Sequence, residues 1–293
     1  MKHVYTISDL RENSLPENAK LAVLGYPVSH SASPQMHQAA LDALNIDISY
    51  IRLELKPGEL TEAFTLMQGL GFLGCNVTIP HKLAARENSH VISDSVKALG
   101  VANTIHFKDG KILADNTDGP GLIQALEEDF KTSIKGSNIL LLGAGGGAGK
   151  AIATQLARVE CHKLYLSNRT ASKLDDLSQK LSDNYAASIH TIGNSAEELS
   201  NAAKGVTIII NATSLGMKPE DAAPFPLESI CPHHLVYDAI YSPPKTELLR
   251  AAESAGAKTS NGLSMLIHQG AISFQIWTER APDISLMRRA ITS

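Results

Sequence analysis

The sequence has few of the features that mark secreted or membrane-spanning proteins. Only three of its 293 residues are cysteines, Cys75, Cys161 and Cys231, and their odd number and wide spacing indicate free thiols rather than disulfide bonds. The longest apolar runs, such as 206–210, are too short to cross a bilayer, and residues 1–20 lack the apolar core of a signal peptide. Together these absences predict a cytoplasmic protein.

The sequence also lacks clusters of positive charge and the spacings typical of metal ligands. The formal net charge is −4 and no polybasic cluster occurs, so neither nucleic acid nor an anionic membrane is an expected partner. The eleven histidines include one adjacent pair, His233–His234, without His-x-x-x-His or Cys-x-x-Cys, so no metal is expected. A hydrophobic content of 43% with 19% charged residues predicts a globular chain, and its length favours two domains.

The most informative segment is the glycine-rich run at 143–149, Gly-Ala-Gly-Gly-Gly-Ala-Gly. A strand pattern precedes it and a helical and a second strand pattern follow, at 138–142, 150–159 and 163–167. This order is typical of the turn that places a dinucleotide pyrophosphate at a helix N-terminus. Gly143 is expected to permit the tight turn, Gly145 to let backbone approach the phosphate, and Ala148 to allow close packing of helix on strand.

The residues after the second strand indicate which dinucleotide binds. An NAD site usually places Asp or Glu there, but this chain has Asn-Arg-Thr at 168–170 with Lys173 close behind. Arg169 and Lys173 would pair with a ribose phosphate, so the sequence favours NADP over NAD. An ATP-binding P-loop is the competing interpretation of the glycine run, but Ala144 and Ala151 stand where it requires Gly and Ser or Thr.

Strand and helix patterns alternate over the first 120 residues. Strands are expected at 20–25, 48–55 (with alternating burial) and 74–79, and helices from 33, with Ser33 as N-cap before Pro34, and at 59–70. This alternation predicts a small α/β domain with a largely parallel sheet. Asp109-Gly110 between strand patterns at 101–107 and 111–114 indicates a hairpin. Residues 1–18 have weak periodicity and are interpreted as an extension of uncertain order.

Later elements include a helix that leads into the second domain and a long final helix. The first opens at Asp118, and the last begins near Ser264, with strands and a helix between them at 186–192, 205–211, 235–239 and 247–255. An apolar face of the final helix is expected at Met265, Ile272 and Ile276. Gln269 falls within that face, so it must be buried and paired or line a cavity.

Three polar segments of the first domain follow strand ends, where open parallel sheets bind ligands. They span 25–34, 76–82 and 115–121, with Asn103 upstream of the third. Their hydroxyls, amides, carboxylates and single ammonium suit a small polyhydroxylated acid. Each residue also has a structural alternative, with Ser33 and Asp118 as helix caps and Lys82 as a solvated lysine, so the interpretation depends on their joint occurrence.

In their order along the chain, these motifs resemble those of the shikimate dehydrogenase family, NADP-dependent enzymes that reduce 3-dehydroshikimate. The resemblance extends from about Leu21 to the C-terminal helix. It is carried by the segments 30–34, 76–82, 115–119, 211–217, 237–241 and 262–269.

This resemblance implies roles for individual residues. Lys82 and Asp118 would be the catalytic pair. The carboxylate end of the substrate would be held by Ser31, Ser33, Thr78 and Tyr241, and the ring hydroxyls by Asn103, Asp118 and Gln269. With the glycine run, the implied cofactor-binding residues are Gly143, Ala144, Gly145, Gly146, Gly147, Ala148, Asn168, Arg169, Thr170, Lys173, Thr213, Ser214, Met217, Gly262 and Met265.

The implied fold is α/β with two domains. Residues 1–117 and 263–293 would form a substrate-binding catalytic domain with a mainly parallel sheet, and 118–262 a Rossmann-type doubly wound domain for NADP(H). The C-terminal helix would return to the first domain, which puts the active site in the cleft between domains.

The implied activity is that of an oxidoreductase acting on a CH–OH group, with hydride transfer from NADPH to 3-dehydroshikimate giving shikimate. That step belongs to chorismate and aromatic amino acid biosynthesis. The active form would be a monomer or a homodimer. Two alternatives stay open: a relative that oxidises quinate or uses NAD, and a non-catalytic, nucleotide-sensing protein on the same fold.

Overall fold

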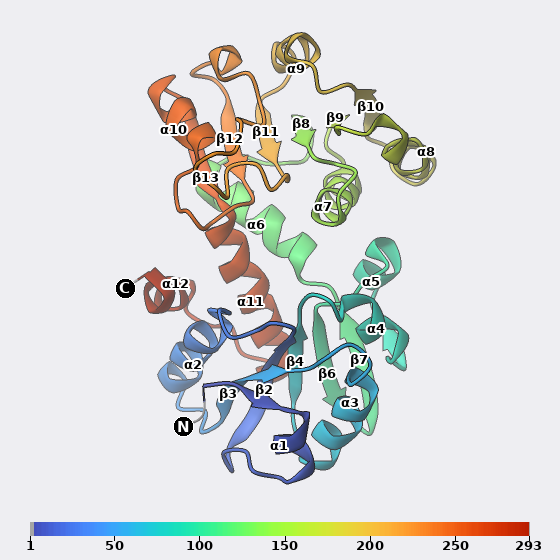
Figure 1. Cartoon of the computed structure of the whole chain (residues 1–293), viewed down its shortest axis with the longest axis vertical. Coiled ribbons are helices and arrows are strands. Elements are labelled where there is room, and N and C mark those ends of the chain that lie inside the picture. Colours follow the sequence, from blue (N-terminus) through green and yellow to red (C-terminus); the bar gives the residue numbers. More distant parts are fainter. Residues whose placement is uncertain (1–2, 293) are drawn as a thin grey trace. The chain divides into compact units, whose positions relative to one another are not determined.

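The computed structural model describes residues 3–292, and the chain divides into two compact units (Figure 1). The first unit comprises Met1–Gly121 and Ile267–Ser293, and the second comprises Leu122–Leu266. Both divisions lie inside helices, α6 (Asp118–Phe130) and α11 (Gly262–Thr278). We propose domain boundaries at 117/118 and 262/263. Helix α6 begins at the first of these boundaries, and α11 begins within one residue of the second.

The first unit is built on a seven-stranded sheet in the order β1-β3-β2-β4-β6-β7-β5. Neighbouring strands are parallel except β4–β6 and β6–β7, which are antiparallel. The strands are β1 (Tyr5–Thr6), β2 (Ala19–Gly25), β3 (Ser49–Glu54), β4 (Gly74–Val77), β5 (Val91–Ile92), β6 (Thr104–Lys108) and β7 (Lys111–Asp115). The helices wholly in this unit are α1 (Ile7–Arg11), α2 (Ser33–Ala43), α3 (Leu60–Gly69), α4 (Lys82–Glu87), α5 (Asp94–Leu99) and α12 (Ile284–Thr292).

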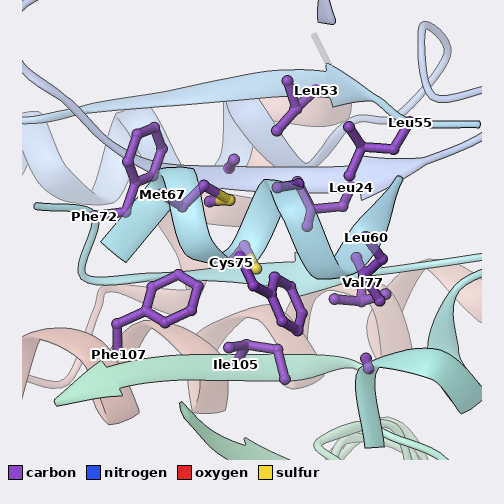
Figure 2. Packing of buried hydrophobic residues seen from close by; sticks show 14 of the residues in the cluster. Leu24, Leu53, Leu55, Leu60, Met67, Phe72, Cys75, Val77, Ile105 and Phe107 are labelled. Atoms are coloured by element: carbon purple, nitrogen blue, oxygen red, sulfur yellow. The ribbon is translucent and has the colours of Figure 1, made fainter. Parts of the chain in front are cut away.

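Helix α3 packs on one face of this sheet through a continuous apolar core. Leucine, methionine and aromatic side chains from α3 and from strands β2, β3, β4 and β6 fill the space between them (Figure 2). The expected alternation of burial along β3 is wrong, because Tyr50, Ile51, Arg52 and Leu53 are all buried. Ile51 and Leu53 join the α3 core, whereas Tyr50 and Arg52 contact α2, so both faces of the strand are covered.

The hairpin expected around Asp109-Gly110 is confirmed. Strands β6 and β7 pair antiparallel, with Lys108 opposite Lys111. Asp109 has φ 52° and Gly110 has φ 71°, the left-handed conformations that a two-residue turn between twisted strands requires.

The expectation that residues 1–18 form an extension of uncertain order is wrong for the part that the structure describes. Strand β1 pairs in parallel with β3, and α1 follows it directly. Tyr5, Ile7 and Leu10 are buried in the same core as α3. Three anchors within six residues are too few to give a detectable period, which is why the sequence pattern missed this element.

The second unit contains a six-stranded, fully parallel sheet in the order β10-β9-β8-β11-β12-β13. In chain order this is 3-2-1-4-5-6, the Rossmann arrangement, and the order reverses beside β8. The strands are β8 (Asn138–Leu142), β9 (Lys163–Ser167), β10 (Ser188–Ile192), β11 (Ile208–Asn211), β12 (Leu235–Asp238) and β13 (Lys258–Asn261). Its helices are α7 (Gly147–Arg158), α8 (Asp175–Asn184), α9 (Ala196–Ala203) and α10 (Glu247–Ser254), with short 3-10 turns η1 (Ala171–Lys173) and η2 (Leu227–Ser229).

Within residues 3–292 no helix combines the length and apolar character needed to cross a membrane. Across the same residues, histidine, cysteine, aspartate and glutamate side chains do not gather in groups of three or more that would hold a metal ion.

The final helices differ from the expectation in number and in their buried face. Helix α11 begins at Gly262, and a further helix, α12, follows it. The buried apolar residues of the first-unit part of α11 include Ile267, Phe274 and Trp277, whereas the expected face of Met265, Ile272 and Ile276 is only half-buried. Trp277 Nε1 donates a hydrogen bond to the Ile105 carbonyl oxygen at 2.8 Å, which ties α11 to β6.

His37 is a buried, uncharged histidine on α2. Its ring stacks on Tyr50 with centroids 4.4 Å apart and planes at 3°, and lies beside Phe274 and Trp277. Neither ring nitrogen makes a hydrogen bond of normal geometry with any residue that the structure describes. Burial lowers the pKa of His37 to about 3, with a smaller opposite effect of the nearby Asn76.

Replacing His37 by phenylalanine is expected to make the free energy of unfolding fall less as the pH is lowered. The unfolded chain binds a proton near the ordinary histidine pKa of about 6.5, whereas the folded chain resists it down to about 3. The wild-type free energy of unfolding should therefore fall below pH 6.5 by on the order of 1.4 kcal/mol per pH unit. Urea unfolding at pH 7 and pH 5 should find that the variant gains roughly 2 kcal/mol relative to wild type at the lower pH. A difference that stays constant between the two pH values would contradict this.

Candidate active site

Four of the polar residues predicted from the sequence converge in the first unit. Lys82 is the first residue of α4, Asn103 directly precedes β6, Asp118 is the first residue of α6, and Gln269 lies on α11. Hydrogen bonds connect all four side chains, although Asn103 and Gln269 are 166 residues apart in the sequence.

Lys82 and Asp118 form an ion pair. The distance from Lys82 Nζ to Asp118 Oδ2 is 2.6 Å, and the side chains are 30% and 22% exposed. The pair is therefore shielded from bulk water but remains accessible to a small molecule. The alternatives were a solvated Lys82 and an Asp118 that caps its own helix. The structure favours neither, since the Asp118 carboxylate accepts from side chains of other segments, Lys82 among them.

Asn103 holds the second oxygen of the Asp118 carboxylate. Its Nδ2 donates to Asp118 Oδ1 at 2.8 Å, and its Oδ1 accepts from the backbone N–H of Thr117 at 2.8 Å. A carboxylate only accepts and a backbone N–H only donates, so these two contacts fix the orientation of the amide. Asp118 is thus held at both oxygens, by Lys82 and by Asn103.

Gln269 is buried and paired, which confirms the expectation for a glutamine on this helix. It is 8% exposed, and its Oε1 accepts from Asn103 Nδ2 at 3.3 Å and from Thr117 Oγ1 at 3.5 Å. Gly121 on α6 allows this approach, because a Cβ there would lie 2.6 Å from the Gln269 nitrogen. The two helices therefore touch through backbone at this point.

The serine segment lies at the start of α2, and the expectation for Ser33 there is wrong. Ser33 is the first helical residue, and Ala32 occupies the cap position in a helical conformation without a side-chain cap bond. Ser33 therefore does not cap this helix, and its backbone N–H donates to Ser31 Oγ at 3.3 Å. Thr78 is half-buried after β4, and its Cγ2 would lie 2.6 Å from a Cβ on Gly25.

Arg52 is a residue of this region that the sequence analysis missed. Its Nε and Nη2 donate to the Ser31 carbonyl oxygen at 3.1 and 2.7 Å, and Nη2 also donates to Gln35 Oε1 at 2.8 Å. Burial lowers the pKa of Arg52. The signal that was available is an arginine inside an otherwise apolar strand, since such a charge needs fixed partners.

The glycine run of the second unit forms the turn between β8 and α7. Gly143 has φ 77°, and a Cβ there would lie 2.7 Å from Thr213 Cγ2, so its expected role in the tight turn is confirmed. The packing role expected of Ala148 is wrong, because Ala148 is exposed. Gly149 is buried instead, and a Cβ on it would overlap the Gly143 carbonyl oxygen. Helix α7 begins at Gly147, three residues earlier than expected, and Gly149 lies against Gly143 and Ala144 of the turn.

The end of β9 carries two exposed cations beside this turn. Asn168 Oδ1 accepts from the Gly145 N–H at 3.3 Å, and its Nδ2 donates to the Thr170 carbonyl oxygen at 2.9 Å. Asn168 thus links the glycine turn to the segment that carries Arg169 and Lys173. Both cations are exposed, and neither forms an ion pair with a carboxylate in the described part of the chain.

Asp238 organises the remaining loops of the second unit, and the sequence analysis gave it no role. It is fully buried, its carboxylate accepts from Asn211 Nδ2, Thr246 Oγ1 and the Ile240 N–H at 3.0, 2.7 and 3.1 Å, and burial raises its pKa. Asn211 Oδ1 in turn accepts from the N–H and hydroxyl of Thr213 at 3.0 and 2.7 Å. Asp238 therefore fixes both the loop after β11 and the turn before Tyr241.

The other predicted cofactor-binding residues occupy different parts of the second unit. Ala144 is buried, whereas Gly146 and Gly147 are exposed at the start of α7. Met217 is exposed, and Met265 packs against the core of this unit. Tyr241, which was predicted to contact the substrate carboxylate, is also exposed. Gly262 begins α11, where a Cβ would overlap the Ala239 carbonyl oxygen, and Ser214 lies in the loop after β11.

Three family models match successive parts of the chain. They describe the shikimate dehydrogenase substrate-binding domain, shikimate/quinate 5-dehydrogenase and the shikimate 5′-dehydrogenase C-terminal domain, at residues 23–105, 124–217 and 262–292. Among curated proteins, the shikimate dehydrogenase (NADP(+)) of Desulforamulus reducens is 37% identical over 273 residues, which cover 92% of this chain and 93% of the relative.

Solved structures share the fold over nearly the whole chain. Shikimate 5-dehydrogenase of Thermus thermophilus, in complex with NADP(H) and shikimate, is 33% identical with a TM-score of 0.80, over 93% of this chain and 98% of that one. The 5-ketofructose reductase of a Gluconobacter species is 30% identical with a TM-score of 0.85, over 93% and 97%. The similarity thus includes enzymes with more than one named substrate.

Proposed function

The chain belongs to the shikimate dehydrogenase family, and we propose that it is an NADP-dependent shikimate dehydrogenase. It transfers hydride reversibly between NADPH and 3-dehydroshikimate, giving shikimate for chorismate and aromatic amino acid biosynthesis. The observation that carries this proposal is the Lys82–Asp118 ion pair, held in place by Asn103. We further propose that the protein acts in the cytoplasm, as a monomer or a homodimer.

The ion pair supplies the chemistry that reduction of a ring ketone requires. Bound NADPH supplies the hydride. Negative charge then develops on the carbonyl oxygen, and the Lys82 ammonium stabilises this charge and donates a proton to the same oxygen. Asp118 orients Nζ from 2.6 Å, and its carboxylate is also available to accept a hydrogen bond from a neighbouring substrate hydroxyl.

The second unit fits the diphosphate and the ribose phosphate of NADP(H). The turn at Gly143 leads into the N-terminus of α7, where backbone N–H groups attract a phosphate. Arg169 and Lys173 have no described carboxylate partner, so a ribose phosphate would find two cations available. Thr213, Ser214 and the other predicted residues of this unit are proposed as the remaining cofactor contacts.

Replacing Ser31 by alanine is expected to raise KM for shikimate by about tenfold with little change in kcat. The Ser31 hydroxyl is proposed to bond the substrate carboxylate, together with Ser33, Thr78 and Tyr241. A contact to the carboxylate is made equally before and during hydride transfer, so it contributes to binding and not to the chemical step. Steady-state kinetics should compare this variant with Ser29→Ala, an exposed serine of the same loop. Equal effects of the two substitutions would contradict the assignment.

Nicotinamide absorbance measurements test the function directly. Shikimate and quinate should each be tried with NADP+ and NAD+, and 5-ketofructose with NADPH. We expect rapid turnover with shikimate and NADP+, and much slower turnover with every other combination. Comparable rates with quinate, 5-ketofructose or NAD+ would assign a different or broader specificity. Cofactor binding without turnover of any of these substrates would favour a nucleotide-sensing protein.

A further inference from the structure

Thr117 stands between Asn116 and the catalytic Asp118, and the proposed mechanism gives it no role. It is 1% exposed, less than either Asn103 or Gln269. Its side chain nevertheless reaches both amides proposed to hold the ring hydroxyls. Thr117 Oγ1 lies 3.1 Å from Asn103 Nδ2 and 3.5 Å from Gln269 Oε1.

A buried hydroxyl cluster surrounds this contact. Thr117 Oγ1 lies 3.1 Å from Ser273 Oγ and 3.2 Å from Thr104 Oγ1. Ser273 follows Gln269 by one turn of α11 and donates its proton to the Gln269 carbonyl oxygen at 2.9 Å. Asn76 Nδ2 donates to Ser273 Oγ at 3.0 Å, so that oxygen acts as an acceptor within the cluster.

The direction of these hydrogen bonds defines what the Thr117 hydroxyl does. Asn103 Nδ2 carries two protons, and Asp118 Oδ1 takes one of them at 2.8 Å. Thr117 Oγ1 is the nearer of the two acceptors for the other, at 3.1 Å against 3.3 Å for Gln269 Oε1. The proton of the Thr117 hydroxyl has Ser273 Oγ, Asn103 Oδ1 and Gln269 Oε1 within reach as acceptors, at 3.1, 3.3 and 3.5 Å. The hydroxyl therefore contacts both amides, Asn103 more closely than Gln269.

We propose that Thr117 is a positioning residue for the substrate hydroxyls, which acts through Gln269 and Asn103. This inference rests on the proposed function, since the two amides are assigned to the substrate there. Without the hydroxyl, the Gln269 amide loses a donor and its orientation is less restricted. Binding of the ring hydroxyls should weaken, while cofactor binding in the second unit stays the same.

The test compares Thr117→Val with Thr117→Ser. Valine keeps the shape and the backbone N–H and removes the hydroxyl, whereas serine keeps the hydroxyl. Valine is expected to raise KM for shikimate about tenfold with KM for NADP+ unchanged, and serine to stay within about twofold of wild type. Should the valine variant not fold, Thr117→Ala against Thr117→Ser makes the same comparison. Equal KM values for shikimate in the variants with and without the hydroxyl would overturn the proposal.

Thr104→Val is the matched control. Thr104 is also 1% exposed and belongs to the same cluster, with Ser273 Oγ at 2.8 Å and Asn103 Oδ1 at 3.0 Å, but its hydroxyl is bonded to neither Gln269 Oε1 nor Asp118 in the described structure. Both valine variants share the structural cost of a lost buried hydroxyl, which thermal unfolding measures. In the described part of the chain Thr104 contacts Asn103 but not Gln269, so a rise in KM for shikimate that is as large for Thr104→Val as for Thr117→Val would show that the contact with Gln269 contributes nothing and would overturn the proposal.

A double-mutant cycle identifies the residue through which Thr117 acts. In a Gln269→Ala background, Thr117→Val should raise KM for shikimate by less than about twofold, because its effect is already lost. A full tenfold effect in that background would contradict the link through Gln269. If wild type itself fails to turn over shikimate, the proposed function has failed. If wild type is active and Thr117→Val matches it, only this inference has failed.

Discussion

Lys82→Ala is expected to lower kcat for reduction of 3-dehydroshikimate by at least about 100-fold. The ammonium is proposed to stabilise the developing alkoxide and to protonate it, and both contributions arise only as the hydride transfers. Removing an interaction of this kind lowers kcat, whereas KM for NADPH should change little. Single-turnover and steady-state kinetics with saturating NADPH measure the effect.

Lys97→Ala is a suitable control for this substitution. Lys97 also pairs with an aspartate of the same unit, Asp94, at 2.9 Å, but both side chains are largely exposed. The control should retain wild-type kcat, since an exposed pair contributes little to stability or chemistry. A Lys82→Ala enzyme with near-normal kcat would show that another group donates the proton.

Arg169→Glu is expected to lower kcat/KM for NADPH by at least about 100-fold and to leave the value for NADH nearly unchanged or improved. The substitution removes a cation proposed to pair with the ribose phosphate and places a carboxylate beside that phosphate. NADH carries ribose hydroxyls at this position, and these can donate hydrogen bonds to a carboxylate. Binding of NADH is therefore not weakened. The ratio of the two kcat/KM values is the quantity to measure.

Lys180→Glu controls for the change in net charge. Lys180 is an exposed residue of α8 in the same unit, and the net charge of its variant equals that of Arg169→Glu. The control should keep the wild-type preference between NADPH and NADH. Similar losses with both cofactors in Arg169→Glu would mean that the arginine supports the fold of the turn and does not select the phosphate.

Local patterns in the sequence predicted local structure well. The Asp109-Gly110 pair predicted the hairpin, since only a few residue types adopt left-handed conformations at both central positions. The order of strand, glycine turn, helix and strand likewise predicted the β8–α7–β9 unit, in which Gly143 adopts a left-handed conformation. Residues 5–11 were missed because their stability comes from a distant strand, β3, and not from their own sequence.

Details of packing within correctly predicted elements depended on helix phase. Helix α7 begins three residues earlier than expected, and the close contact expected of Ala148 is made instead by Gly149, against Gly143 and Ala144. One residue of displacement at α2 turned Ser33 from a cap into a buried helical residue. Successive helical residues point about 100° apart, so small errors in a boundary reassign a side chain to another surface.

The sequence by itself determined the family, the order of the motifs and the residue types of the site, because each motif is a short segment and their order can be followed along the chain. Only the tertiary structure decided which side chains meet. It joined Lys82, Asn103, Asp118 and Gln269 in one set of hydrogen bonds, and it brought Thr117 to the two amides. Such contacts link α4, α6, α11 and the residue before β6, and their distances are set by how these elements pack together. Spacing along one chain does not encode that packing.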